Sequence, residues 1–199
     1  MKLHKRIYCI EGHWDYGDRE VEPSVEPVLQ LLHGMGQWEY ARRDCATVKE
    51  LDYFLQREWN RCREGSILYI ASHGEPGMVQ FSDGEKQGIE TLADKIDCTG
   101  CLIHFGGCDV LAIDKSRVRD LVTKTGSVGV SGYEKEVGWA DVANSPALAL
   151  ELLLFSSIST QGINLPDGRS ARRKLTKLAE QLQSKFPECG FQLHTKWDS

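Results

Sequence analysis

The chain has 199 residues, of which 41% are hydrophobic and 27% charged, so it can bury the core of one ordinary globular domain and is not a disordered protein. Its formal net charge of −5 gives no electrostatic reason to expect nucleic-acid binding, and its longest apolar stretch, Ala147 to Phe155, is far shorter than the roughly 20 residues that span a bilayer. The seven cysteines are an odd, scattered set in a chain without an export signal, so we expect reduced thiols and a cytosolic location.

Apolar periodicity predicts an alternation of strands and helices. In chain order these are a strand at 5–11, a helix at 23–32, a strand at 37–41, a helix from 48 to about 64, a strand at 66–71, a hairpin at 78–84, a helix at 90–96, a strand at 101–105, a helix at 116–124, a strand at 127–131, helices at 146–156 and 170–185, and a strand at 191–195. Thr47 with Glu50 forms a capping box, and Ser145 with Pro146 supplies another helix start. Because no repeat or linker divides the chain, residues 1–199 are predicted to form a single α/β domain, a three-layer α/β/α sandwich around a mainly parallel sheet.

Two of the predicted strands end in residues that can carry chemistry. The strand at 66–71 runs into His73 and Gly74, and the strand at 101–105 runs through two glycines into Cys108. The carboxyl ends of parallel strands share one edge of a sheet, so we expect these two segments to be neighbours there. A histidine beside a cysteine can take the thiol proton and leave a nucleophilic thiolate, while glycines leave backbone N–H groups open to a developing oxyanion. The pattern therefore predicts acyl transfer.

The same segments resemble the caspase-fold cysteine peptidases of clan CD. The features that carry the resemblance are an apolar strand ending in Ser72-His73-Gly74, a hairpin over 77–88, and a second apolar strand ending in Gly-Gly-Cys-Asp at 106–109. Within that clan the chain is most similar to the bacterial CHAT and caspase-like branch, and the resemblance covers about Ile67 to Phe155.

The resemblance implies a peptidase with a dyad of Cys108 and His73, and an oxyanion hole made by the backbone N–H groups of Gly74 and Cys108. It also implies regulatory processing of a protein or peptide partner in a bacterial defence or cell-death pathway. We expect no cofactor and no metal.

The sequence departs from better-known branches at positions that determine specificity. Two residues before the cysteine, caspases carry Gln and metacaspases carry Asp, whereas this chain has Gly106. The segment that bears an arginine in caspases corresponds here to Ser131, Gly132, Tyr133 and Glu134. We expect these residues and Asp109 to bind substrate, and the two carboxylates favour a basic or small P1 residue.

Alternative interpretations remain open. The chain could be a catalytically silent caspase-like interaction module, since Gly106 lacks a pocket determinant. Cys98, Cys101 and His104, followed by Cys108, offer the ligand types of a zinc site, but residues 101 and 104 lie on opposite faces of a strand, which disfavours it.

Three other features are given ordinary structural interpretations. His104 is predicted to be a core histidine and His13 a surface residue. The basic residues around Arg172 share their helix with Glu180 and predict a solvated face.

Overall fold

The computed structural model describes residues 6–14, 23–62, 64–82, 84–138, 145–161, 163, 165 and 168–198. Its larger sheet has the strand order β2-β1-β3-β7-β8-β9. These strands are β1 (Arg6–Gly12), β2 (Glu39–Cys45), β3 (Ile67–Ala71), β7 (Leu102–Phe105), β8 (Gly129–Tyr133) and β9 (Phe191–Thr195). Neighbouring strands are parallel except for β8 and β9, so the predicted mainly parallel sheet is confirmed.

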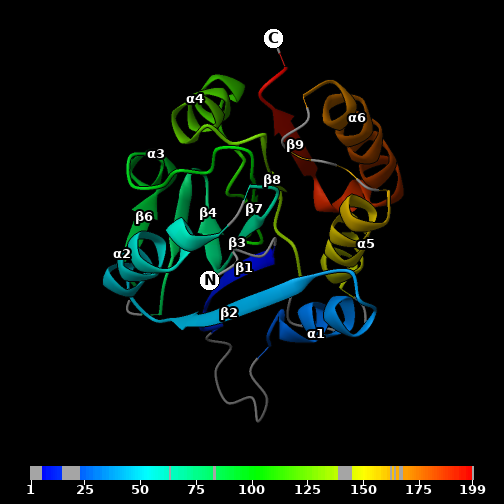
Figure 1. The fold of residues 1–199 in the computed structure, drawn as a ribbon. Coiled ribbons are helices and arrows are strands. Elements are labelled where there is room, and N and C mark those ends of the chain that lie inside the picture. The colour runs from blue at the N-terminus through cyan, green and yellow to red at the C-terminus, as the bar shows by residue number, and fades with distance from the viewer. Residues whose placement is uncertain are drawn as a thin grey trace.

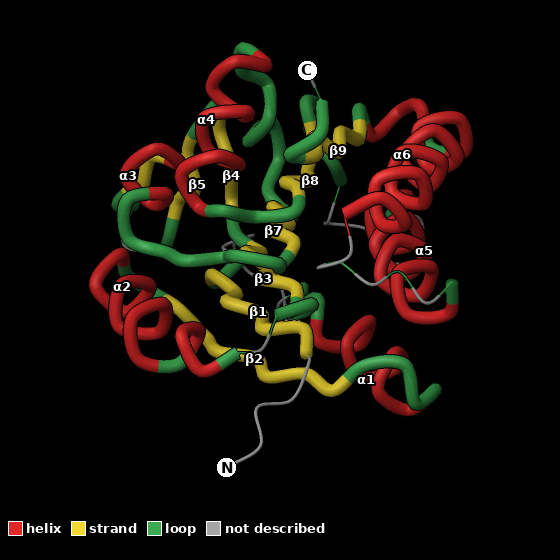
Figure 2. The backbone as a smooth tube through the Cα atoms, turned by 45° about the horizontal axis from the view of Figure 1, so that its top comes forward, coloured by secondary structure: helices red, strands yellow, loops and turns green. Residues whose placement is uncertain are grey.

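Helices cover both faces of this sheet, as Figures 1 and 2 show. One face carries α1 (Glu26–Gly34), α5 (Pro146–Thr160) and α6 (Gly168–Lys185), and the opposite face carries α2 (Val48–Arg57), α3 (Ile89–Ala93) and α4 (Lys115–Thr125). The buried side chains form a separate hydrophobic cluster on each side of the sheet. The structure is therefore the predicted three-layer α/β/α sandwich.

The central strands are buried on both faces, as expected for parallel strands between two helical layers. Every residue of β3 and β7 is buried. Side chains alternate along β3, with Ile67, Tyr69 and Ala71 in one cluster and Leu68 and Ile70 in the other. This burial fixes the positions of the strand ends that precede His73 and Cys108.

Helix α2 begins as its capping box predicts. Thr47 Oγ1 accepts a hydrogen bond from Glu50 N at 3.1 Å, and the Glu50 carboxylate accepts one from Thr47 N at 3.2 Å. The prediction that this helix continues to about residue 64 is wrong, because it ends at Arg57 and a short 3-10 turn, Trp59–Arg61, follows. There Trp59 is buried and its indole N–H donates to Asp97 O at 2.9 Å, so tertiary packing redirects the chain.

A smaller sheet follows β3 directly. It consists of β4 (His73–Glu75), β5 (Met78–Gln80) and β6 (Lys86–Gly88), paired antiparallel in chain order. The predicted hairpin is confirmed by the pairing of β5 with β6, while Asp83 of its predicted turn lies outside the described residues. His73 therefore opens a strand of its own immediately after the central sheet.

Helix α5 begins at Pro146, as the Ser145-Pro146 pair predicts, and Ser145 Oγ accepts a hydrogen bond from Leu148 N at 3.5 Å. Among its buried apolar residues lies one fully buried acid, Glu151. Within the ranges that the structure describes, no helix has both the length and the apolar character needed to cross a membrane.

Candidate active site

The structure brings together the two strand-end segments that carry His73 and Cys108. Strands β3 and β7 are direct neighbours, so the segments leave the same edge of the sheet side by side. A Cβ built on Gly74 would lie 2.3 Å from the carbonyl oxygen of Cys108, and one built on Gly107 would lie 2.6 Å from that of Ser72. The two backbones are thus in direct contact, and only glycine permits that approach.

The Cys108 thiol is half-buried beneath the segment that follows β8. Its Sγ donates to Val137 O at 3.4 Å and accepts from Val137 N at 3.3 Å. Burial is the main effect that raises the pKa of this thiol; the charges of Asp109 and Glu136 raise it further, against the opposing effect of the Val137 N–H. The thiol is therefore protonated near neutral pH and needs a base to become a nucleophile.

The chain turns sharply directly after Cys108. Asp109 has a φ of 56°, a left-handed conformation that Asp adopts more readily than most residues. Two backbone hydrogen bonds then join this turn to the end of β8 and the segment after it, from Asp109 N to Lys135 O at 3.2 Å and from Leu111 N to Tyr133 O at 2.9 Å. The turn and these bonds fix the backbone on which the cysteine sits.

His73 is half-buried, and its ring contacts Trp14, which follows β1. The ring centroids are 5.3 Å apart and the planes meet at 69°. His13, which precedes Trp14 in the chain, is exposed, which confirms the prediction of a surface residue. The contribution of Trp14 was not predicted, because a single aromatic residue after a strand gives no signal of the side chain that it contacts.

The structure places most of the predicted substrate-binding segment in the interior. The side chains of Ser131 and Tyr133 are fully buried, and Gly132 is packed against the backbone, with a hypothetical Cβ 2.9 Å from Phe105 O. In this arrangement the side chains of Ser131 and Tyr133 point into the interior, so any contact of these two residues with substrate would involve their backbone. Glu134 differs, since it is half-buried and accepts a hydrogen bond from Gln192 Nε2 at 2.9 Å.

A buried polar network explains these orientations. His104 Nδ1 lies 2.9 Å from Ser131 Oγ, and His104 Nε2 lies 3.0 Å from Glu151 Oε1. Glu151 also accepts hydrogen bonds from the phenols of Tyr69 and Tyr133, whose pKa values are raised by burial so that they stay protonated. The prediction that His104 is a satisfied core histidine is confirmed.

This network also bears on Gly106 and on the zinc interpretation. A Cβ on Gly106 would lie 2.8 Å from the ring of Tyr69 and 3.3 Å from Glu151 Oε1, so the network fills the space beside this glycine. Cys98 and Cys101 belong to the hydrophobic cluster on the other side of the sheet from His104 and Glu151, which separates the proposed zinc ligands. No group of three or more ligand side chains suited to a metal occurs among the residues described.

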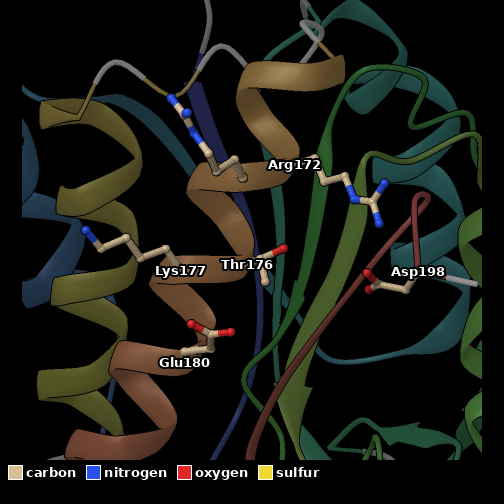
Figure 3. A pocket seen from close by; sticks show the side chains of 6 residues that line it. Arg172, Thr176, Lys177, Glu180 and Asp198 are labelled. Carbon is tan, nitrogen blue, oxygen red and sulfur yellow. The ribbon is translucent and has the colours of Figure 1, made fainter.

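The basic side chains of Arg172, Arg173 and Lys177 on α6 are exposed, as predicted. A cavity of about 660 Å³ lies along α6 and is lined by Arg172, Arg173, Thr176, Lys177, Glu180 and Asp198. In Figure 3 the Arg172 side chain points toward Asp198, while Lys177 extends to the other side of the helix. Three cations and two carboxylates line it, so the cavity does not present a surface of one charge.

Comparisons with known proteins agree with the fold. A solved structure of pro-sf-caspase-1 is similar to this chain with a TM-score of 0.51 and 13% sequence identity, over 93% of this chain and 83% of that chain. At this identity the match establishes a caspase-like fold and nothing about activity. No curated protein matches the chain.

The comparison with protein families gives a match over most of the chain. Residues 4–161 match the model described as a family of unknown function, DUF6642. The chain therefore belongs to the DUF6642 family.

Proposed function

We propose that this protein is a cysteine peptidase in which Cys108 is the nucleophile and His73 the general base. The observation that supports this most strongly is the backbone contact between their two segments. Cys108 O lies so close to Gly74 that a side chain at position 74 would not fit. The caspase-like fold and the neighbouring carboxyl ends of β3 and β7, at the edge of the sheet where ligands collect, also support this proposal. The whole chain is proposed to act as one peptidase domain.

In the proposed reaction His73 takes the proton of the Cys108 thiol, and the sulfur forms a bond to the carbonyl carbon of the scissile peptide. The backbone N–H groups of Gly74 and Cys108 hold the developing oxyanion. As the C–N bond breaks, His73 returns the proton to the leaving amine. Water then hydrolyses the thioester and restores the thiol.

The substrate is proposed to be a protein or peptide with a basic or small P1 residue. Two carboxylates support this preference: Asp109 follows the nucleophile, and Glu134 lies in the segment that is tied to the cysteine turn. The resemblance to the CHAT and caspase-like branch supports regulatory proteolysis of a partner in a bacterial defence or cell-death pathway. We propose a cytosolic location and no cofactor for this activity.

A second function, a silent interaction module, is favoured by one observation. The Cys108 sulfur hydrogen-bonds to the backbone of Val137, and burial raises the pKa of the thiol. If that arrangement is permanent, the fold would serve for binding and not for cleavage.

The test is cleavage of a fluorogenic peptide library scanned at P1, with wild type and Cys108→Ala compared at equal concentration. The peptidase proposal expects cleavage by wild type, none by Cys108→Ala, and faster turnover after Lys or Arg. Cys62→Ala is the matched control, because Cys62 is also half-buried but follows the 3-10 turn Trp59–Arg61 and packs against the hydrophobic cluster on the other side of the sheet. Equal cleavage by wild type and Cys108→Ala would remove Cys108 from the mechanism.

A further inference from the structure

The His73 ring has an aromatic wall on one side. Trp14 packs against it edge to face, with centroids 5.3 Å apart, and only 3% of the Trp14 side chain is exposed. A histidine that starts a short strand at a sheet edge can rotate about two side-chain bonds. A fixed ring in contact with it removes part of that freedom.

The indole of Trp14 is itself held in place by Glu11, the acid near the end of β1. Trp14 Nε1 donates to Glu11 Oε1 at 3.1 Å. Glu11 is 2% exposed, so this bond is shielded from water. The ring that contacts His73 is therefore anchored at its polar end.

Glu11 in turn is fixed by three groups from two other parts of the chain. Val25 N donates to it at 2.8 Å and Ser24 Oγ at 2.9 Å, and the guanidinium of Arg42 on β2 also donates to it. The Arg42 guanidinium also forms ion pairs with the carboxylates of Asp44, at 2.6 Å, and Glu26, at 3.7 Å. The Glu11 carboxylate thus links β1 to β2 and to the start of α1.

We propose that Trp14 is a positioning residue for His73, and that Glu11 and Arg42 hold it there. This inference rests on the proposed dyad of Cys108 and His73. It adds the Trp14 ring as the group that orients the general base, His73. A general base acts only within hydrogen-bond reach of the proton it takes, and a misplacement of about 1 Å can cost roughly 100-fold in rate. In this proposal Trp14 acts through His73.

The experiment is a double-mutant cycle on the full chain. The rate of Cys108 alkylation by iodoacetamide is followed by peptide mass spectrometry, which needs no knowledge of the substrate. Trp14→Leu removes the ring and Trp14→Phe keeps one, and each is measured with His73 present and in the His73→Ala background. Trp38→Phe is the control, because Trp38 is buried in the same cluster and its Nε1 donates to Phe155 O at 2.8 Å.

With His73 present, Trp14→Leu is expected to slow alkylation about tenfold, Trp14→Phe about twofold and Trp38→Phe not at all. In the His73→Ala background the Trp14 variants are expected to change nothing. An equal slowing in both backgrounds, or none in either, would overturn the positioning role. If His73→Ala alone left the rate unchanged, the dyad itself would fail, which is a separate result. Should Trp14→Leu not fold, Trp14→Phe compared across the two backgrounds decides the question.

Discussion

Replacing Gly74 by Ala puts a methyl group where the structure has no room for one. The new Cβ would lie 2.3 Å from Cys108 O, 2.5 Å from a methyl of Val110 and 3.1 Å from the carbonyl carbon of Gly107. The first of these is about 1 Å closer than van der Waals contact allows. Because the main obstacle is backbone and not the end of a flexible side chain, the two segments must move apart.

The cost follows from that displacement. Overpacking of a core typically costs about 1–3 kcal/mol, and a forced backbone shift belongs at the upper end, about 3 kcal/mol for Gly74→Ala. For a protein of this size that corresponds to a fall in melting temperature of about 6–12 °C. Separation of the segments by about 1 Å should also lower the rate of Cys108 alkylation by at least about tenfold.

Urea denaturation followed by circular dichroism measures the first effect, and iodoacetamide labelling measures the second. Gly138→Ala is the matched control, since it lies close in sequence to Val137 and a Cβ there meets nothing within 4 Å. We expect that control to stay within about 0.5 kcal/mol of wild type. If Gly74→Ala were equally neutral and Cys108 reacted at the wild-type rate, the contact between the two segments would not exist as described.

Three further predictions concern charge, burial and capping. Asp109→Asn removes a charge that raises the pKa of Cys108, so that pKa should fall and the alkylation profile should shift to lower pH; an unchanged profile would contradict this. Glu151→Ala leaves three buried donors without their acceptor and should cost about 3–5 kcal/mol in urea denaturation, and a loss below about 1 kcal/mol would argue against the network. Thr47→Ala removes the hydroxyl that accepts from Glu50 N in the capping box and should cost about 1 kcal/mol by the same measurement, whereas no change would mean that α2 does not depend on its cap.

Much of the fold could be predicted because strong local signals mark it. The continuous apolar runs of β3 and β7 predict strands buried on both faces, and the polar starts at Thr47 and Ser145 predict two helix beginnings. The end of α2 could not be predicted in this way. It depends on Trp59 turning into the core, a tertiary contact that no local pattern encodes.

The candidate site could likewise be predicted only in part. His73 and Cys108 could be found because each follows a buried strand, and strand ends meet at one edge. The buried orientation of Ser131 and Tyr133 could not be predicted, because a strand buried on both faces has no polar alternation to show which way a residue points. Their partner Glu151 left only a weak signal, a single acid within an apolar helix.

The contact between Trp14 and His73 could not be predicted, for a different reason. Glu11 and Trp14 lie at and just after the end of β1, Arg42 lies on β2, and His73 follows β3; each alone is an ordinary surface-type or loop residue. Only the side-by-side packing of β1, β2 and β3 brings them to the ring of His73. Sequence patterns of short range cannot report such a junction.

The central claim is that His73 activates Cys108, and competitive alkylation of the seven thiols tests it most directly, because it requires no substrate. Cys108 and Cys62 are the two half-buried thiols, and burial raises the pKa of Cys62 to about 11. We predict that limiting iodoacetamide at pH 7.5 labels Cys108 first in wild type and that His73→Ala removes this lead over Cys62. Labelling of Cys108 no faster than Cys62, or a lead that survives His73→Ala, would contradict the account.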